Sequence, residues 1–382
     1  GARCAGAATA MLLARQGHDV VVVDRAEFPS DTLSTHSIAR GGVTQLARWG
    51  LLDQVVASGA PPIRQVSFHT TEGVITRAIK QRAGVDHLVA PRRHILDALL
   101  LDAAKEAGAR VETGVTIDTV HRDADGRACG VSGRTGTSTI DVHARFVVGA
   151  DGLRSRVASA VDAEVIDERH RNGAVFYAYV GGLDGEGTEF HLADRAMAGV
   201  FPTHGGEANV WICGPSAALA GIRGPEEHRT ARFLELIDAC SPSLAERLRA
   251  STQTTAVRGL LGMPNRVRRA SGPGWALVGD AGYFRDAVTG HGITDAFRDA
   301  ELLARALSPA LYGDVDEASA LRRYDLDRSR MQADLFRITV RLAEYPPLAE
   351  FVELQRELSA RIEVEAEELA SWPTLERPLV AA

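Results

Sequence analysis

The chain begins with a glycine-containing loop, a helix of small residues and a short apolar run, in that order. The chain begins GARCAGAATAMLLARQG. From Ala5 to Gln16 small and apolar residues recur at helical spacing, and Gly17 follows, where a helix stops. Residues 19–24, DVVVVD, have the continuous apolar character of a strand buried on both faces of a parallel sheet. A right-handed crossover of this kind needs a parallel strand before the loop, so we expect a strand ahead of Gly1 that this sequence lacks.

The loop matches the dinucleotide-binding pattern GxGxxG only in part. Gly1 and Gly6 hold the first and third positions, and Arg3 stands where the second glycine would let the backbone approach a pyrophosphate. Asp24 follows Gly6 by 18 residues, close to the spacing of about 20 expected for an acidic residue on a ribose hydroxyl. An ordinary helix start remains the alternative for the loop alone. A carboxylate at this place would also repel a 2′-phosphate, which disfavours NADP here.

Composition limits the class of protein. The chain has 382 residues, enough for about two domains. Hydrophobic residues make up 45% and charged residues 24%, as in soluble globular enzymes. The net charge of −7 and the absence of a basic run make nucleic acid an unexpected partner. Four scattered cysteines without a CxxC pair predict neither disulfides nor a zinc site, so we expect no metal and a cytoplasmic location. No apolar run approaches the about 20 residues of a membrane helix.

The order of the expected elements predicts an α/β fold. Parallel-type strands near 19–24, 110–115, 145–150 and 275–279 surround a mainly antiparallel block. This arrangement predicts a Rossmann-like domain interrupted by an antiparallel sheet domain that binds substrate, with a helical C-terminal tail. The expected regions are a discontinuous Rossmann-like domain lacking its first strand (1–65, 90–160 and 265–310), the sheet domain (66–89 and 161–264) and the tail (311–382). The other expected elements are helices at 38–52 and 93–107, hairpins at 66–79 and 117–143, and strands at 174–183, 189–193 and 207–214.

Two further motifs give the chain a family resemblance. They are GADGLRSRVA at 149–158 and WALVGDAGYFRDAVTGHGITDAFRDAELLA at 275–304. Together with the N-terminal loop and the RxxLD helix start at 93–97, they follow the order seen in one family. The chain resembles the FAD-dependent monooxygenases of the para-hydroxybenzoate hydroxylase fold, the group A flavoprotein hydroxylases. It also resembles their geranylgeranyl-reductase-like relatives.

The resemblance implies a role for each matching residue. Gly1 and Gly6 would line the FAD pyrophosphate, Asp24 would hold the adenosine ribose, and Arg93 would reach back to FAD. We predict that the Arg3 side chain lies along the pyrophosphate or adenine edge of FAD, although it could instead turn away. The Asp-Gly and Gly-Asp motifs would contact FAD, and the turn at 290–292 would lie beneath the isoalloxazine. The full expected cofactor set is Gly1, Arg3, Cys4, Ala5, Gly6, Asp24, Arg25, Arg93, Asp151, Gly152, Gly279, Asp280, Gly290, Gly292 and Ile293.

Each role has a structural alternative. Asp151 could simply cap the helix that follows it, and Asp280 could be a turn former. Arg93 could lie on the surface, and its neighbour Arg92 leaves the register open. His291 could be a partly exposed loop residue.

The candidate catalytic residues are His36 and His291. His36 lies in STHSIARGG at 34–42, which the resemblance places near the flavin ring and the substrate. Histidine titrates near neutral pH, so His36 is a candidate proton carrier, although it could instead tie down its own loop. Aromatic residues on the sheet strands would wall the substrate cavity, with alternate residues facing away. They are Phe176, Tyr177, Tyr179, Phe190, Phe201 and Trp211, with His191 among them.

The resemblance implies a FAD-dependent monooxygenase. NAD(P)H, bound transiently, would reduce the flavin, and O2 would form a flavin hydroperoxide that hydroxylates or epoxidises a small organic molecule. Tyr283-Phe284-Arg285 replaces a histidine-bearing segment of the aromatic hydroxylases, and Asp286-Ala287 stands where relatives often have Asp-Pro. The first of these departures favours the reductase-like branch. A FAD-dependent reductase of an unsaturated or isoprenoid substrate is therefore one alternative, and a non-catalytic flavoprotein that binds a hydrophobic molecule is another. The chain could be a monomer or a homodimer.

Overall fold

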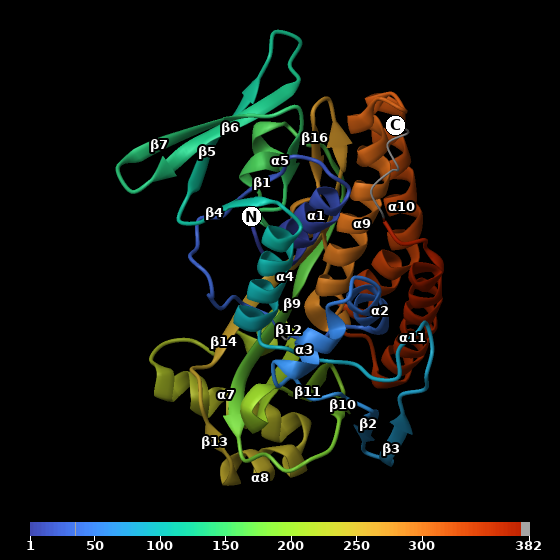
Figure 1. The fold of residues 1–382 in the computed structure, drawn as a ribbon. Helices are drawn as coiled ribbons and strands as arrows, with labels where there is room; N and C mark the ends of the chain where they lie inside the picture. The colour runs from blue at the N-terminus through green and yellow to red at the C-terminus, as the bar shows by residue number, and fades with distance from the viewer. Residues whose placement is uncertain (35, 376–382) are drawn as a thin grey trace.

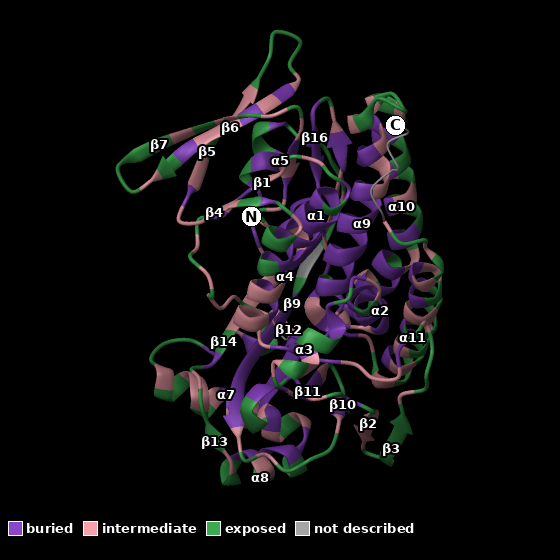
Figure 2. Ribbon diagram, viewed as in Figure 1, coloured by how far each residue is buried: buried purple, intermediate pink, exposed green. Residues whose placement is uncertain are grey.

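The N-terminal loop, helix and strand form as expected, but the strand is not buried on both faces, because Val22 is buried and Val21 and Val23 are only partly buried. The computed structural model describes residues 1–34 and 36–375. Helix α1 (Cys4–Arg15) follows the loop, and strand β1 (Val21–Val23) follows the helix. Most of α1 is buried because its small side chains allow close packing against α4 (Arg93–Glu106) and α9 (Gly292–Tyr312) (Figures 1 and 2).

Short parallel strand pairs flank these helices. β1 pairs in parallel with β4, and β8 pairs in parallel with β16, so the four segments expected as parallel strands are confirmed. β15 adds an antiparallel strand to β16. The bounds are β4 (Arg110–Glu112), β8 (Val147–Gly149), β15 (Ser271–Gly272) and β16 (Trp275–Leu277).

A large, mainly antiparallel sheet forms the lower half of the view in Figure 1. Its strand order is β17-β14-β9-β12-β11-β10-β2-β3, with β13 also paired to β9, and only the β10–β2 pair among its assigned ladders is parallel. The bounds are β2 (Gln65–Thr70), β3 (Gly73–Ala78), β9 (Val165–Gly181), β10 (Thr188–Ala193), β11 (Ala196–Pro202), β12 (Glu207–Pro215), β13 (Thr252–Gln253), β14 (Arg258–Arg268) and β17 (Tyr283–Phe284).

The two faces of this sheet pack against different helices. Tyr177 and Tyr179 of β9 lie on the face that packs against the C-terminal helices α10 (Glu317–Leu342) and α11 (Leu348–Ser371). Phe176 and Val180 lie on the opposite face, against α7 (Glu226–Cys240) and α8 (Pro242–Ala250). The alternation follows from the two-residue period of a strand.

Several elements differ in detail from the expectation. The helical stretch expected at 38–52 divides at Gly50, whose φ is +76°, into α2 (Arg40–Arg48) and α3 (Leu52–Ala57). The hairpin expected at 117–143 is a three-stranded meander. The remaining bounds are β5 (Thr116–Arg122), β6 (Ala128–Thr135), β7 (Ser138–His143), α5 (Arg156–Ala160) and α6 (Ser216–Leu219). The predicted α/β class with an inserted sheet and a helical C-terminal part is confirmed, whereas the domain boundaries stay a prediction.

Candidate active site

One large cavity brings the predicted site residues together. Its volume is about 1240 Å³, and it extends from the N-terminal loop to strands β9 and β14 of the large sheet. Every predicted cofactor-binding or catalytic residue lines it except Gly279. Segments separated by up to about 290 residues therefore meet at one place.

The N-terminal loop is shaped for close backbone approach. A Cβ on Gly6 would lie 1.7 Å from the Gly1 carbonyl oxygen, and a Cβ on Gly1 would lie 2.3 Å from the Ala150 carbonyl oxygen. Helix α1 has no side-chain cap among the described residues, and Cys4, Ala5 and Gly6 of its first turn line the cavity. Unpaired first-turn N–H groups form an anion site, as a pyrophosphate requires.

Asp24 holds this loop in place at the end of β1. Its Oδ2 accepts a hydrogen bond from the Ala2 N–H at 2.6 Å, and its Oδ1 accepts one from the Ala26 N–H at 2.8 Å. The side chain is buried but lines the cavity, and Arg25 beside it is exposed. The carboxylate is thus fixed where the resemblance expects a ribose hydroxyl.

Arg3 and Arg93 share one buried carboxylate. Arg3 Nη1 donates to Asp97 Oδ2 at 2.8 Å, and Arg93 Nη2 donates to Asp97 Oδ1 at 3.0 Å. Arg92 turns the other way and places its guanidinium 3.6 Å from the Tyr179 ring centre. This settles the register, because Arg93 and not Arg92 lines the cavity. The contact of Arg3 with FAD stays a prediction.

The two aspartates of the later motifs differ in their surroundings. Asp151 Oδ2 accepts hydrogen bonds from the N–H groups of Arg156 at 2.6 Å and Val157 at 3.1 Å, so Asp151 does cap α5 while lining the cavity. Asp280 faces the cavity, and the surrounding protein raises its pKa to about 6 by desolvation, which Arg93 only partly opposes. Gly279 lies behind the cavity wall, with a φ of +56° that favours glycine.

The turn before α9 is open on its cavity side. A Cβ on Gly290 or Gly292 would meet no described atom within 4 Å. His291 between them is buried, and its Nε2 lies 2.6 Å from Glu365 Oε2 of α11. The alternative of a partly exposed loop histidine is therefore excluded.

Below this turn lies a buried ionic network that the sequence analysis missed. Arg298 donates to Asp295 Oδ1 at 2.7 Å and to Glu365 Oε1 at 2.9 Å, and Arg285 donates to Asp295 Oδ2 at 2.8 Å. Burial opposes ionisation of Glu365, but His291 and Arg298 outweigh it and hold its pKa below the usual range. Charged residues at helical spacing on α9 were the one available signal, and nothing pointed to Glu365 as their partner.

His36 lines the cavity as a buried residue. Its φ is +67°, its ring stacks on Tyr179 with centroids 5.4 Å apart, and only 1% of the residue is exposed. Neither ring nitrogen has a hydrogen-bond partner among the described residues, so the ring does not tie down the loop by hydrogen bonds. Burial and the nearby Arg93 and Arg92 lower the pKa of His36 well below 6.5, which makes the ring neutral at pH 7.

Apolar and aromatic side chains of the large sheet also line the cavity. They are Tyr177, Leu260, Met263 and Phe284, and we call the part that they line the inner chamber. The His36 ring lies 6.2 Å from the Tyr177 ring between centroids. Asp286 at its edge was noted in the sequence only as a departure from the family. One oxygen of this carboxylate, Oδ2, has no partner among the described residues, and burial raises the pKa of Asp286 to about 6.

Comparison with known proteins identifies the family. The FAD binding domain family matches residues 1–339, so the chain belongs to that family. A kynurenine 3-monooxygenase from Xanthomonas euvesicatoria pv. vesicatoria is 28% identical, covering 98% of this chain and 84% of the relative. A digeranylgeranylglycerophospholipid reductase from Methanopyrus kandleri is 26% identical, covering 94% and 92%.

Solved structures share the fold. The myxobacterial chondrochloren halogenase has a TM-score of 0.81 at 22% identity, covering 98% of this chain and 92% of that one. A probable FAD-dependent monooxygenase from Pseudomonas aeruginosa has a TM-score of 0.76 at 21% identity, covering 95% and 98%. The resemblance to the para-hydroxybenzoate hydroxylase fold is thus confirmed, and the chain is a FAD-dependent oxidoreductase. Among the described residues, no helix combines the length and apolar character needed to cross a membrane.

The residues present fit FAD. The close-packed glycine loop offers an anion site, Asp24 and Asp280 offer carboxylates for hydroxyl groups, and the open turn at 290–292 leaves room for a flat ring. The start of α9 at that turn places the positive end of a helix at the cavity, where it would stabilise negative charge.

Proposed function

We propose that the protein is a FAD-dependent monooxygenase that uses NAD(P)H and O2 to hydroxylate or epoxidise a small organic molecule. One observation carries the proposal: a single cavity is lined by both the N-terminal glycine loop and the inner chamber, and the His36 ring, whose nitrogens have no partner among the described residues, lies beside Tyr177 of that chamber. Bound FAD supplies the redox chemistry, and the protein positions the substrate and excludes water. The kynurenine 3-monooxygenase relative supports this choice.

The protein's own groups divide the work by position. We assign the FAD pyrophosphate to the first turn of α1, and the hydroxyl groups of the cofactor to Asp24 and Asp280. His36 is neutral at pH 7 and its ring nitrogens have no partner among the described residues, so it can accept a hydrogen bond from a substrate hydroxyl in the inner chamber. Its lowered pKa makes it a weak base, so it would hold a substrate proton only transiently. Asp286, whose pKa is about 6, can exchange protons at the chamber edge. NAD(P)H would bind transiently over the open cavity.

The remaining expectations are proposals on the same footing. We propose the three regions with the boundaries predicted above, a cytoplasmic location, and a monomer or homodimer. The net charge of −7 supports the expectation that nucleic acid is not a partner.

A reductase of an unsaturated or isoprenoid substrate is the second candidate. The digeranylgeranylglycerophospholipid reductase relative favours it, as does Tyr283-Phe284-Arg285 in place of a histidine-bearing segment. Such an enzyme would add two hydrogens without consuming O2.

The test is NAD(P)H oxidation by the FAD-loaded protein against a panel of phenols, polyketides and isoprenoids. A monooxygenase gives substrate-stimulated O2 uptake and a product heavier by one oxygen atom. Turnover that continues without O2 and adds two hydrogens would replace the first candidate with the second.

A further inference from the structure

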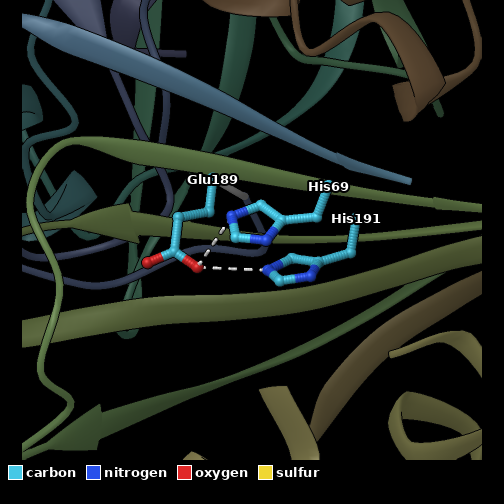
Figure 3. A group of neighbouring side chains, drawn as sticks. All are labelled: His69, Glu189 and His191. Carbon is cyan, nitrogen blue, oxygen red and sulfur yellow. Dashed lines mark hydrogen bonds and ion pairs between the residues drawn. The ribbon is translucent and has the colours of Figure 1, made fainter. Parts of the chain in front are cut away.

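A cluster of side chains that can bind a metal ion lies outside the large cavity described above, which we call the FAD cavity. His69 of β2 and His191 of β10 are directly opposite each other in the parallel strand pair, and Glu189 lies two residues before His191. Phe190 between them packs toward the C-terminal helices, so Glu189 and His191 point to the other face of the sheet, toward α8. Figure 3 shows both imidazoles directed at one carboxylate oxygen.

The distances between these atoms match those around a metal ion. Glu189 Oε2 lies 3.1 Å from His191 Nε2 and 3.8 Å from His69 Nε2 (Figure 3). Ligands about 2.1 Å from a tetrahedral zinc ion are about 3.4 Å from one another, which falls between these two values. The second distance is too long for a hydrogen bond, whereas an ion between the atoms would bridge it.

The three side chains are of the kinds that bind transition metals. Two imidazoles and one carboxylate form a common donor set for Zn²⁺ and related ions. Their ligand atoms converge on one place in the structure.

Helix α8 supports the cluster from behind. Ser241 Oγ at its N-cap lies 2.8 Å from His191 Nδ1, which leaves Nε2 available for an ion when Nδ1 carries the proton. Arg247 donates to Glu189 Oε1 at 2.9 Å and to Oε2 at 2.7 Å, which orients the carboxylate and leaves Oε2 a further lone pair.

The cluster is accessible from one side. His191 and Glu189 are buried, but the His69 side chain is 26% exposed, and a cavity of about 250 Å³ is lined by Glu189 and Arg247. The two rings are stacked within 19° of parallel, with centroids 4.1 Å apart. The ring of His69 must therefore tilt for both lone pairs to meet one ion, and its exposure allows this.

We propose that His69, Glu189 and His191 bind one divalent transition-metal ion of the Zn²⁺ class, with a water molecule in the fourth position. The ion would join β2 to β10 and, through Ser241 and Arg247, to α8, and so brace this edge of the large sheet. None of its three ligands lines the FAD cavity, so the proposal does not depend on the proposed function.

Another group of side chains, His291 with Asp295 and Glu365, also has converging ligand atoms, but its carboxylates already have cationic partners. Arg285 donates to Asp295, and Arg298 donates to both Asp295 and Glu365. All three members of this group are buried. Two arginine charges beside the carboxylates disfavour a third cation, and we therefore expect zinc only at His69.

The test is titration of the chelator-treated protein with Zn²⁺. Calorimetry measures the stoichiometry and affinity, and thermal unfolding at increasing Zn²⁺ concentrations measures the Tm. We expect one Zn²⁺ per chain and a Tm that rises with Zn²⁺ concentration, as for any ligand of the folded state. His69→Gln, at a half-buried position that should tolerate the change, should weaken binding at least about 100-fold and abolish the rise in Tm. Glu189→Gln and His191→Ala should do the same if they fold.

His121→Gln is the matched control, because His121 pairs with Asp141 at 3.0 Å on the exposed meander. It should bind Zn²⁺ like the parent protein. The proposal is overturned if the parent binds no Zn²⁺, or if His69→Gln binds it as tightly as the parent. FAD content, measured in parallel, should be the same in the parent and in His69→Gln, which separates this test from that of the proposed function.

Discussion

Replacing Gly6 by alanine tests the shape of the cofactor loop. The new Cβ would lie 1.7 Å from the Gly1 carbonyl oxygen and 2.9 Å from the Gly1 carbonyl carbon. Real Cβ contacts stay above 3.0 Å, and the obstructing atoms are backbone, so the loop must move by at least about 1.3 Å. Overpacking of this kind costs about 1–3 kcal/mol, and the better helix propensity of alanine offsets about 1 kcal/mol. We therefore expect only a modest loss of stability, up to about 2 kcal/mol.

The effect on FAD binding should be much larger. A shift of this size breaks the alignment of the first-turn N–H groups with a pyrophosphate, and each hydrogen bond to a charged group contributes about 1.5–3 kcal/mol. Loss of two such bonds raises the Kd for FAD by on the order of 10²-fold or more. Titration of apoprotein with FAD, with thermal unfolding in parallel, measures both quantities.

Gly181→Ala is the control, because its Cβ would meet only the Thr254 methyl group at 3.8 Å among the described atoms. It should bind FAD as the parent does. An unchanged FAD affinity in Gly6→Ala would refute the placement of the pyrophosphate at this loop.

Three further changes test the rest of the site. The pKa of Asp286 is raised from 3.8 to about 6, so its contribution to stability is present below pH 3.8 and is lost as the pH rises through 6. The free energy of unfolding of Asp286→Asn should therefore rise relative to that of the parent by about 2.5 kcal/mol between pH 4 and pH 8, and an equal difference between the two proteins at both pH values would contradict this. Glu365→Gln removes the partner of His291 and Arg298 and should lower the free energy of unfolding by about 3–5 kcal/mol in urea titrations; a loss below 1 kcal/mol would show that the network is not held by charge. His36→Gln should keep FAD binding and lower kcat by a factor on the order of 10² in steady-state assays, and full activity would exclude proton transfer by this ring.

The sequence was most informative where the signal is local. The run DVVVVD and the glycine loop predicted the N-terminal loop, helix and strand, because a buried strand and close backbone approach each require particular residue types. Strands β11 and β14 were not predicted. β14 pairs with β9 through three register shifts, so its residues do not keep the two-residue alternation that marks a strand.

The site could be predicted as a set of motifs but not as a set of contacts. All of the predicted cofactor-binding and catalytic residues except Gly279 line one cavity, because motifs at strand ends meet when the strands pair. Of the seven strand residues predicted to wall the substrate cavity, only Tyr177 lines it. The partner of His291 lies 74 residues away on α11, and no sequence pattern relates the two positions. The neutral state of His36 depends on burial against Tyr179 and on two nearby arginines, which only the folded chain brings together.

The most direct test of the proposed reaction follows the oxygen atom. The FAD-loaded protein is supplied with NAD(P)H, isotopically labelled O2 and the substrate that most stimulates NAD(P)H oxidation, and the product is analysed by mass spectrometry. A monooxygenase gives a product with one labelled oxygen atom from O2. A product without label, formed equally well in the absence of O2, would contradict the assignment.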